Sequence, residues 1–188
     1  MKKNNIFYIL GVLLVLASVG LILFNSNLAS QQGADIPNIT RKIQHLMPQP
    51  TAAVPDQYTQ PEMPVCQIDG TDYCALLKVP ILGITLPVAD SWHSDGATPG
   101  RYSGSSYDSS MIIGGKADKY QLGFVTQLDI GDKIAVIDML GGQFNYTVER
   151  IDRAKTLDSE KLTSTNCSLT LFAYVAKEKK YVVVRCGA

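Results

Sequence analysis

The stretch that decides the fold is SLTLFAYVAKEKKYVVVRC, residues 168–186. It contains two runs rich in β-branched and aromatic residues, and a charged segment around Lys177 separates them. This pattern predicts two antiparallel strands joined by a turn. If the hairpin folds about Lys177, residue 167 lies opposite residue 187 or thereabouts, which brings Cys186 within reach of Cys167.

Similar short segments fill the chain from residue 66 onward. Five of them are rich in residues that favour β-strands, and each is bounded by Gly, Asp, Ser or Pro: ALLKVP, GITLPVAD, SMIIGG, DKIAVIDML and QFNYTVERID. Two pieces break the series, because KYQLGFVTQL (119–128) has helical spacing and DSEKL (158–162) begins like a capped helical turn. Roughly six to eight strands in residues 66–188 predict an all-β closed barrel or sandwich with one or two short helices.

The N-terminal segment differs from the rest of the chain. Residues 1–24 hold two lysines followed by an uncharged apolar run that is nearly long enough, at about 1.5 Å per residue, for a bilayer core of ~30 Å. We expect a transmembrane signal anchor with a cytoplasmic N-terminus and the remainder outside the cell. Cleavage of a signal peptide after Ala29 is the alternative. Residues 25–65 are Pro-rich and predict an extracellular linker, followed by the domain at 66–188. Within the linker, ITRKIQHLM (39–47) is expected to form at most one or two helical turns.

Charge and composition exclude several partners. The chain has 17 basic and 17 acidic residues and no basic block, so we expect no nucleic-acid partner. A small cluster at Lys177, Lys179 and Lys180 is interpreted as a solvated turn. The chain has no CxxC motif and no nearby pair of histidines, so we expect no metal and no cofactor.

The four cysteines predict two disulfides, since an even number of cysteines outside the membrane is typical of paired thiols. Cys66 and Cys74 flank an Asp-Gly turn signal midway between them, as in a hairpin. Cys167 and Cys186 lie on the two strands of the opening stretch. We therefore expect the pairs Cys66–Cys74 and Cys167–Cys186.

The predicted domain contains one histidine, His93, next to the single tryptophan, Trp92. A catalytic site of the Ser-His-Asp or Cys-His type would have to use His93. Its loop is rich in Gly, Ser and Asp, so we interpret it as a solvent-exposed residue. Trp92 is interpreted as a core residue, with a recognition platform as the alternative.

The order of several segments carries a family resemblance. Between residues 74 and 186 the chain contains five segments in this order: LLKVPILGITLPVAD, TPGRYSGSSYDSSMIIGGK, FVTQLDIGDKIAVIDMLGGQFNYTVERI, LTLFAY and KYVVVRC. Together they resemble a sortase, nearest to the class B-like enzymes of Gram-positive bacteria. LTLFAY is similar to the family's LTLxTC, and KYVVVRC to its last strand, which the catalytic arginine opens. The resemblance implies a closed eight-stranded β-barrel behind an N-terminal transmembrane helix.

Sortases are cysteine transpeptidases in which a thiolate attacks a sorting signal, a histidine acts as acid or base, and an arginine holds the oxyanion. By the resemblance, the histidine position falls on Lys116, the cysteine on Tyr174 and the arginine on Lys180. The threonine before the cysteine falls on Ala173. A phenol and an ammonium group are poor replacements for a thiolate and an imidazole, and lysine lacks the planar fork of arginine. We therefore expect no cysteine transpeptidase activity.

The expected role is that of a pseudoenzyme at the cell surface. It would bind a sorting-signal peptide, a surface-protein or pilus subunit, or a partner sortase in a groove lined by Lys116, Ala173, Tyr174 and Lys180. One alternative is an active peptidase or transpeptidase with a tyrosinate at Tyr174, whose pKa two neighbouring cations would lower. In another, Tyr174 fills the emptied pocket while the lysines face solvent. The third is a purely structural scaffold of the cell envelope.

Overall fold

The computed structural model describes residues 13–20, 35–52, 62–163 and 167–188. The chain divides into two compact units, Met1–Asp35 and Ile36–Ala188. The predicted anchor at 1–24 lies mostly outside the described residues, and its described part, 13–20, is a helix with exposed side chains. No helix among the described residues is both long enough and apolar enough to cross a membrane.

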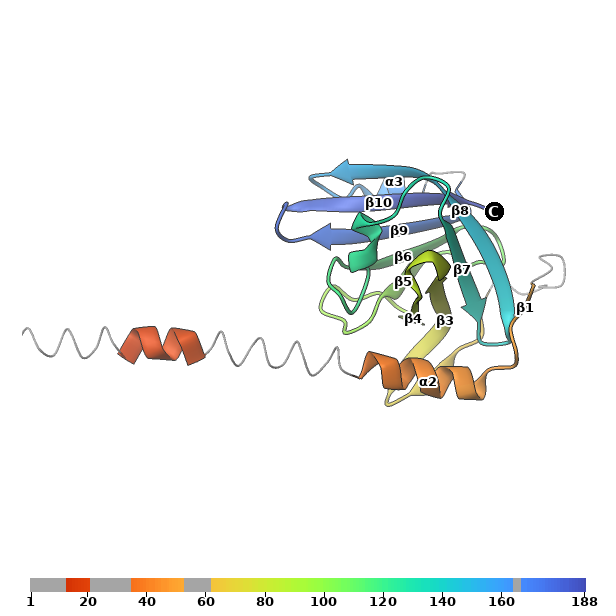
Figure 1. Cartoon of the computed structure of the whole chain (residues 1–188), viewed down its shortest axis with the longest axis horizontal. Coiled ribbons are helices and arrows are strands. Elements are labelled where there is room, and N and C mark those ends of the chain that lie inside the picture. Colours follow the sequence, from red (N-terminus) through yellow and green to blue (C-terminus); the bar gives the residue numbers. More distant parts are fainter. Residues whose placement is uncertain (1–12, 21–34, 53–61, 164–166) are drawn as a thin grey trace, which may run out of the picture. The chain divides into compact units, whose positions relative to one another are not determined.

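The second unit is built mainly of strands (Figure 1). The segments rich in Val, Ile, Leu and aromatic residues form most of these strands, and turns or loops bounded by Gly, Asp and Ser separate them. In chain order the elements are α2 (Ile36–Leu46), β1 (Thr51–Ala52), β2 (Cys66–Ile68), β3 (Thr71–Val79), η2 (Pro80–Leu82), β4 (Ile84–Ala89), β5 (Gly100–Ser103), β6 (Met111–Lys116), η3 (Gly123–Thr126), β7 (Lys133–Asp138), β8 (Gly142–Ala154), α3 (Ser159–Thr163), β9 (Leu169–Val175) and β10 (Lys180–Gly187).

Eight of the strands close into a barrel. Their order is β3-β4-β5-β6-β9-β10-β8-β7, and β7 returns to β3. The pairs β4–β5 and β6–β9 are parallel, whereas the other neighbours in the barrel are antiparallel. This closed mixed barrel confirms the prediction from the sequence. Closure matters because it leaves no free edge within the barrel, and only the short β1 and β2 extend the sheet beyond it.

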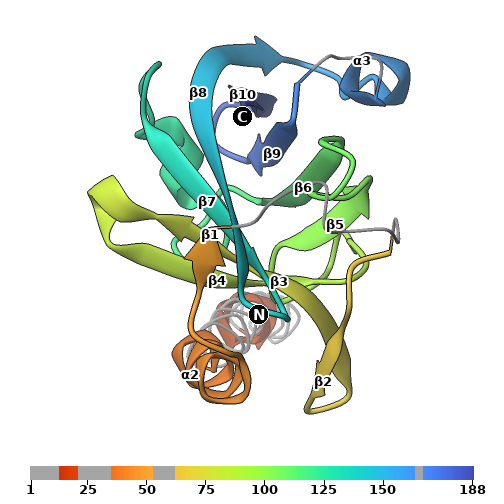
Figure 2. The same ribbon diagram turned by 90° about the vertical axis from the view of Figure 1, so that its right-hand side faces the viewer.

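Two layers of apolar side chains hold the unit together. The barrel interior contains a large cluster of aliphatic residues from every barrel strand except β5, together with Phe124 and Val125 of η3. Outside the barrel, α2 buries Ile43 against Leu76 and Ile137 on the outer face of the sheet. Figure 2 shows α2 and β2 outside the ring of strands. Burial at about 25 cal/mol per Å² makes these two layers the main source of stability.

The segment that the sequence assigned to a linker, residues 25–65, differs from that prediction in its middle part. Ile36, Thr40 and Ile43 recur at helical spacing and are buried, so they anchor α2 to the barrel. Thr51 and Ala52 then pair in parallel with the start of β8. Residues 36–52 are therefore part of the compact unit Ile36–Ala188. The predicted helix at 119–128 is represented by the 3-10 turn η3, while the predicted helical turn at 158–162 corresponds to α3.

Candidate functional site

The candidate site lies where β6, β9 and β10 reach the same end of the barrel. Parallel pairing places Lys116 of β6 beside Tyr174 of β9. Antiparallel pairing places Tyr181 of β10 on the other side of Tyr174. Since directly paired residues project to the same face of a sheet, these three side chains share the outer face of the barrel.

Lys180 and Ala173 lie elsewhere. Lys180 pairs with Val175, not with Tyr174, so the pleat directs the Lys180 side chain to the face opposite that of Tyr174. Ala173 is fully buried in the barrel interior, beneath the site. Of the four predicted site residues, the structure therefore brings together Lys116 and Tyr174. It adds Tyr181, which the sequence did not indicate because the register of the hairpin differs by one residue from the expected one.

Lys116 fastens a loop. Its ammonium Nζ donates a hydrogen bond to the carbonyl oxygen of Gly96 at 3.2 Å, and Nε2 of the buried Gln121 donates to the same oxygen at 2.9 Å. The backbone N–H of Lys116 in turn donates to Oε1 of Gln121 at 2.9 Å. Three polar groups thus tie the loop between β4 and β5 to the end of β6. In this arrangement Lys116 is a hydrogen-bond donor, which is the opposite of a general base.

Tyr174 remains accessible. Its side chain belongs to a residue that is 41% exposed, and its ring contacts that of Tyr181 with centroids 5.1 Å apart and planes tilted by 52°. The backbone carbonyl of Tyr174 accepts a hydrogen bond from Ala117 at 3.1 Å, which joins β9 to the chain after β6. Tyr174 therefore lies at the surface and does not fill an interior pocket. These two tyrosine rings, tilted against each other, offer aromatic surface to an apolar or aromatic partner.

An aromatic cluster covers the middle of the same outer face. Phe172, two residues before Tyr174, is fully buried and contacts Trp92 and Tyr102 edge to face, with centroids 5.4 Å from each. Gly114 of β6 provides the space, because a Cβ there would overlap the Phe172 ring and lie 2.8 Å from Nε1 of Trp92. Leu162 of α3 packs on this cluster from outside. The core interpretation of Trp92 is thus supported, although the core that it joins lies outside the barrel.

The thiols are placed away from the site and are unpaired. All four cysteines are free, so the two predicted disulfides are absent. Cys66 pairs with Tyr73 and packs in the outer cluster, whereas Cys74 packs inside the barrel, so the two thiols lie on opposite sides of the sheet. Cys186 pairs with Leu169, and Cys167 precedes the first residue of β9.

Burial makes two of these thiols unreactive. It raises the pKa of Cys74 and of Cys186 to about 12. A nucleophilic cysteine requires the reverse shift, toward a thiolate at neutral pH. Cys186 also lies six residues along β10 from Lys180, the partner of Val175, which corresponds to about 20 Å of strand. Neither of these two thiols lies at the candidate site.

His93 lies beside a separate cavity. This cavity has a volume of about 410 Å³ and is lined by the turn between β2 and β3 and by the loop after β4. Asp72 and Asp90 also line it, and Arg101 forms an ion pair with Asp90. Within the described ranges, no three side chains of His, Cys, Asp or Glu are grouped as a metal site would require.

Solved structures provide the comparison with known proteins. No family model and no curated protein matches the chain. A sortase D5 transpeptidase of Clostridium perfringens is similar at 17% identity, with a TM-score of 0.53, over 67% of this chain and 81% of that one. Sortase C1 of Streptococcus agalactiae is similar at 22% identity and TM-score 0.53, over 64% and 69% of the two chains. Sortase A of Corynebacterium diphtheriae is similar at 18% identity and TM-score 0.52, over 86% and 84%.

At this level of identity, the similarity establishes the fold: the unit is a mostly-β protein with a sortase-like barrel. These three proteins are sortases of classes D, C and A. The nearer resemblance to class B-like enzymes, drawn from the sequence, stays a prediction.

Proposed function

We propose that this chain is a sortase-like pseudoenzyme that binds an extended peptide at the end of β6, β9 and β10 without cleaving it. The observation that carries the proposal is the composition of that end. Lys116, whose ammonium group donates to a loop carbonyl, is paired across the strands with the exposed Tyr174. Nucleophilic acyl transfer needs an activated nucleophile with a base beside it, and Lys116 is engaged as a donor. What this end does offer is an accessible tyrosine pair flanked by a cation.

The peptide would be a segment resembling a sorting signal, presented by a surface-protein or pilus subunit or by a partner sortase. Exposed aromatic rings supply contact area at low entropic cost, and carbonyl groups of an extended peptide would accept hydrogen bonds from the Lys116 ammonium. In this role the protein acts as an accessory to the assembly of surface proteins. It would hold a substrate segment for another enzyme or keep it from reacting.

The proposed location is the outer face of the cell membrane. Residues 1–24 would form a single-pass anchor with a cytoplasmic N-terminus, and the unit Ile36–Ala188 would lie outside the cell. Protease added to intact cells tests this topology. The unit should be degraded while a cytoplasmic control protein survives, and protection of the unit until the cells are lysed would contradict the proposed orientation.

The binding proposal is tested by NMR on the isotopically labelled full chain in a mild detergent, titrated with LPxTG-like and NPxTN-like peptides. We expect shifts centred on the amides of Lys116, Tyr174 and Tyr181, with the peptide intact by mass spectrometry after a day. Ile130→Ala serves as a surface control, because Ile130 is 71% exposed and lies on the turn before β7.

Two other outcomes would replace the proposal. Peptide fragments that depend on Tyr174 would support the tyrosinate enzyme, which the exposure of Tyr174 beside Lys116 makes sterically feasible. Absence of both shifts and fragments would favour the structural scaffold of the cell envelope.

A further inference from the structure

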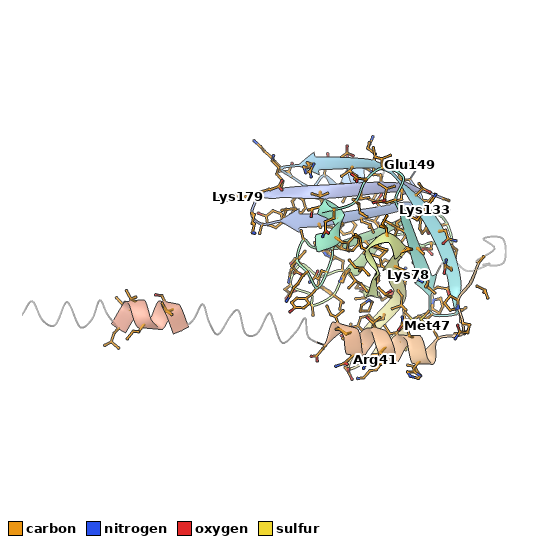
Figure 3. The ribbon with its side chains drawn as sticks, viewed as in Figure 1. Arg41, Met47, Lys78, Lys133, Glu149 and Lys179 are labelled. Atoms are coloured by element: carbon orange, nitrogen blue, oxygen red, sulfur yellow. The ribbon has the colours of Figure 1, made fainter. Side chains whose placement is uncertain are left out.

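One end of the barrel carries a cluster of like charges, here called the basic tip. It consists of Arg153 and Lys155 at the end of β8, and of Lys177, Lys179 and Lys180 in and after the turn between β9 and β10. Four of these residues are exposed and Lys180 is partly exposed. Figure 1 shows the end of β8 and the β9–β10 turn at the same extremity of the barrel, and Figure 3 places Lys179 there.

Strand pairing forces these charges together. Tyr181 pairs with Ala154 and Val182 with Arg153, and in the sequence Lys155 follows Ala154 directly while Lys180 directly precedes Tyr181. Like charges that face each other across strands are destabilising. The overall composition does not require such a cluster of positive charges, because the chain has as many acidic as basic residues. The structure therefore keeps a repulsive cluster on one surface of a neutral protein.

The ion pairs of the described residues leave the basic tip unneutralised. Among the ion pairs of the described residues, none includes a residue of the basic tip. Asp152, which precedes Arg153, contacts Arg150 at 2.9 Å and Arg185 at 3.3 Å instead. Glu178 lies in the turn itself and offsets one of the five positive charges. The tip therefore presents an excess of positive charge to solvent.

The shape of the tip limits the kind of partner. Neither of the two described cavities, one beside His93 and one beside α2, is lined by a tip residue. An exposed cluster of like charges attracts a partner through its charge density. Neighbouring strands are about 4.8 Å apart, so cations on β8, on β10 and in the turn are spread over roughly 10 Å. That spread fits a linear polymer with regularly spaced anionic groups.

We propose that the basic tip binds an extended polyanion of the phosphodiester class. Lysine ammonium groups bind phosphate as flexible point charges, which suits a polymer of variable conformation. An acidic protein segment would in addition need a groove or a free strand edge to fix its backbone, and the tip lies at strand ends. This proposal is independent of the peptide-binding function, since Arg153, Lys177 and Lys179 lie outside the candidate site.

The test measures the affinity of the detergent-solubilised full chain for fluorescent poly(glycerol phosphate) by anisotropy. The tip variant carries Arg153→Glu, Lys177→Glu and Lys179→Glu. The control variant carries Arg41→Glu, Lys78→Glu and Lys133→Glu, which are exposed and lie away from the tip (Figure 3). Both variants replace one arginine and two lysines, so they change the net charge equally. Thermal unfolding of each variant verifies that the fold is kept, and Gln at the same tip positions replaces Glu if charge reversal impairs folding.

We expect the tip variant to bind at least about 10-fold more weakly and the control variant to stay within roughly 3-fold of the parent chain. Binding of the parent should fall steeply with salt, on the order of 100-fold between about 50 and 200 mM if roughly four phosphates are contacted. An equal loss in both variants would overturn the proposal, because it would indicate general attraction to a positive protein. So would tighter binding to poly-glutamate of equal length, or a tip dependence seen only with anionic lipid nanodiscs.

Discussion

The two ends of the β9–β10 hairpin have opposite chemical properties. At one end Tyr174 and Tyr181 lie paired at the surface next to Lys116. At the other end Leu169 and Cys186 are paired and fully buried. The first end therefore presents an accessible phenol beside a lysine, whereas the Cys186 thiol at the second end is shielded from solvent. Surface chemistry can differ between the two ends of one hairpin while the packing is kept, because fold and chemistry depend on different residues.

The largest expected effect concerns thiol reactivity at these two ends. With a pKa of about 12, the Cys186 thiol is ionised on the order of 1,000-fold less at pH 8 than an ordinary thiol. We expect iodoacetamide to modify Cys186 and Cys74 very slowly in the folded chain and to modify Tyr174→Cys rapidly. Site-resolved mass spectrometry measures the three rates.

The pH dependence sharpens this prediction. Burial raises the pKa of the Cys186 thiol, so the neutral thiol is favoured in the folded chain. The thiolate fraction of Cys186 should therefore still increase about tenfold per pH unit between pH 8 and 11. An exposed thiol at position 174 should reach its maximum rate near pH 9 to 10. If Cys186 reacts as fast as Tyr174→Cys at pH 8, the contrast between the two ends is wrong.

The next effect concerns the middle of the hairpin. Phe172 is fully buried in the outer aromatic cluster, so Phe172→Ala should lower the free energy of unfolding by about 3–5 kcal/mol. Urea denaturation followed by circular dichroism measures this change. Phe172→Leu, which keeps most of the volume, should cost clearly less. A loss below about 1 kcal/mol for the alanine variant would mean that the outer face is loosely packed and open to ligands.

A smaller effect distinguishes the two donors that hold Gly96. Gln121 is buried and bonds both Gly96 and the Lys116 backbone, so Gln121→Leu should cost about 1–3 kcal/mol. Lys116→Met removes one partly exposed donor and should cost less. Amide hydrogen exchange of residues 90–98 measures the loosening of the loop. Equal acceleration by both variants would show that the ammonium group anchors the loop as strongly as Gln121 does.

The sequence predicted the barrel because its signals are local. Turn residues such as Gly131 and Gly141 have positive φ and separate β7 and β8 from their neighbours, and such residues are readable from composition. The sequence indicated only one or two helical turns at 39–47 within the linker, whereas α2 spans Ile36–Leu46 and buries Ile36, Thr40 and Ile43. The surrounding prolines are typical of a linker and conceal this packing against the barrel.

The site was harder to predict because it depends on register. A hairpin centred on Lys177 pairs residue 174 with residue 180, but the observed pairs are Tyr174–Tyr181 and Val175–Lys180. A shift of one residue moves a side chain to the other face of the sheet. The same limit applies to the cysteines, since spacing along the chain did not reveal that Cys66 and Cys74 lie on opposite sides of the sheet.

The smallest expected effect on stability concerns Tyr174, at the accessible end of the hairpin, and tests whether that end serves binding. Tyr174 is 41% exposed and contacts mainly the ring of Tyr181, so Tyr174→Ala should lower the free energy of unfolding by less than about 1 kcal/mol. Its effect on peptide binding should nevertheless be large, with the NMR shifts lost while Ile130→Ala retains them. Two residues on the same face of one strand, Phe172 and Tyr174, would then differ in kind: the first stabilises the fold and the second serves recognition. If Tyr174→Ala instead destabilises the chain as much as Phe172→Ala does, Tyr174 belongs to the packed cluster, and the accessible end of the hairpin has no separate function.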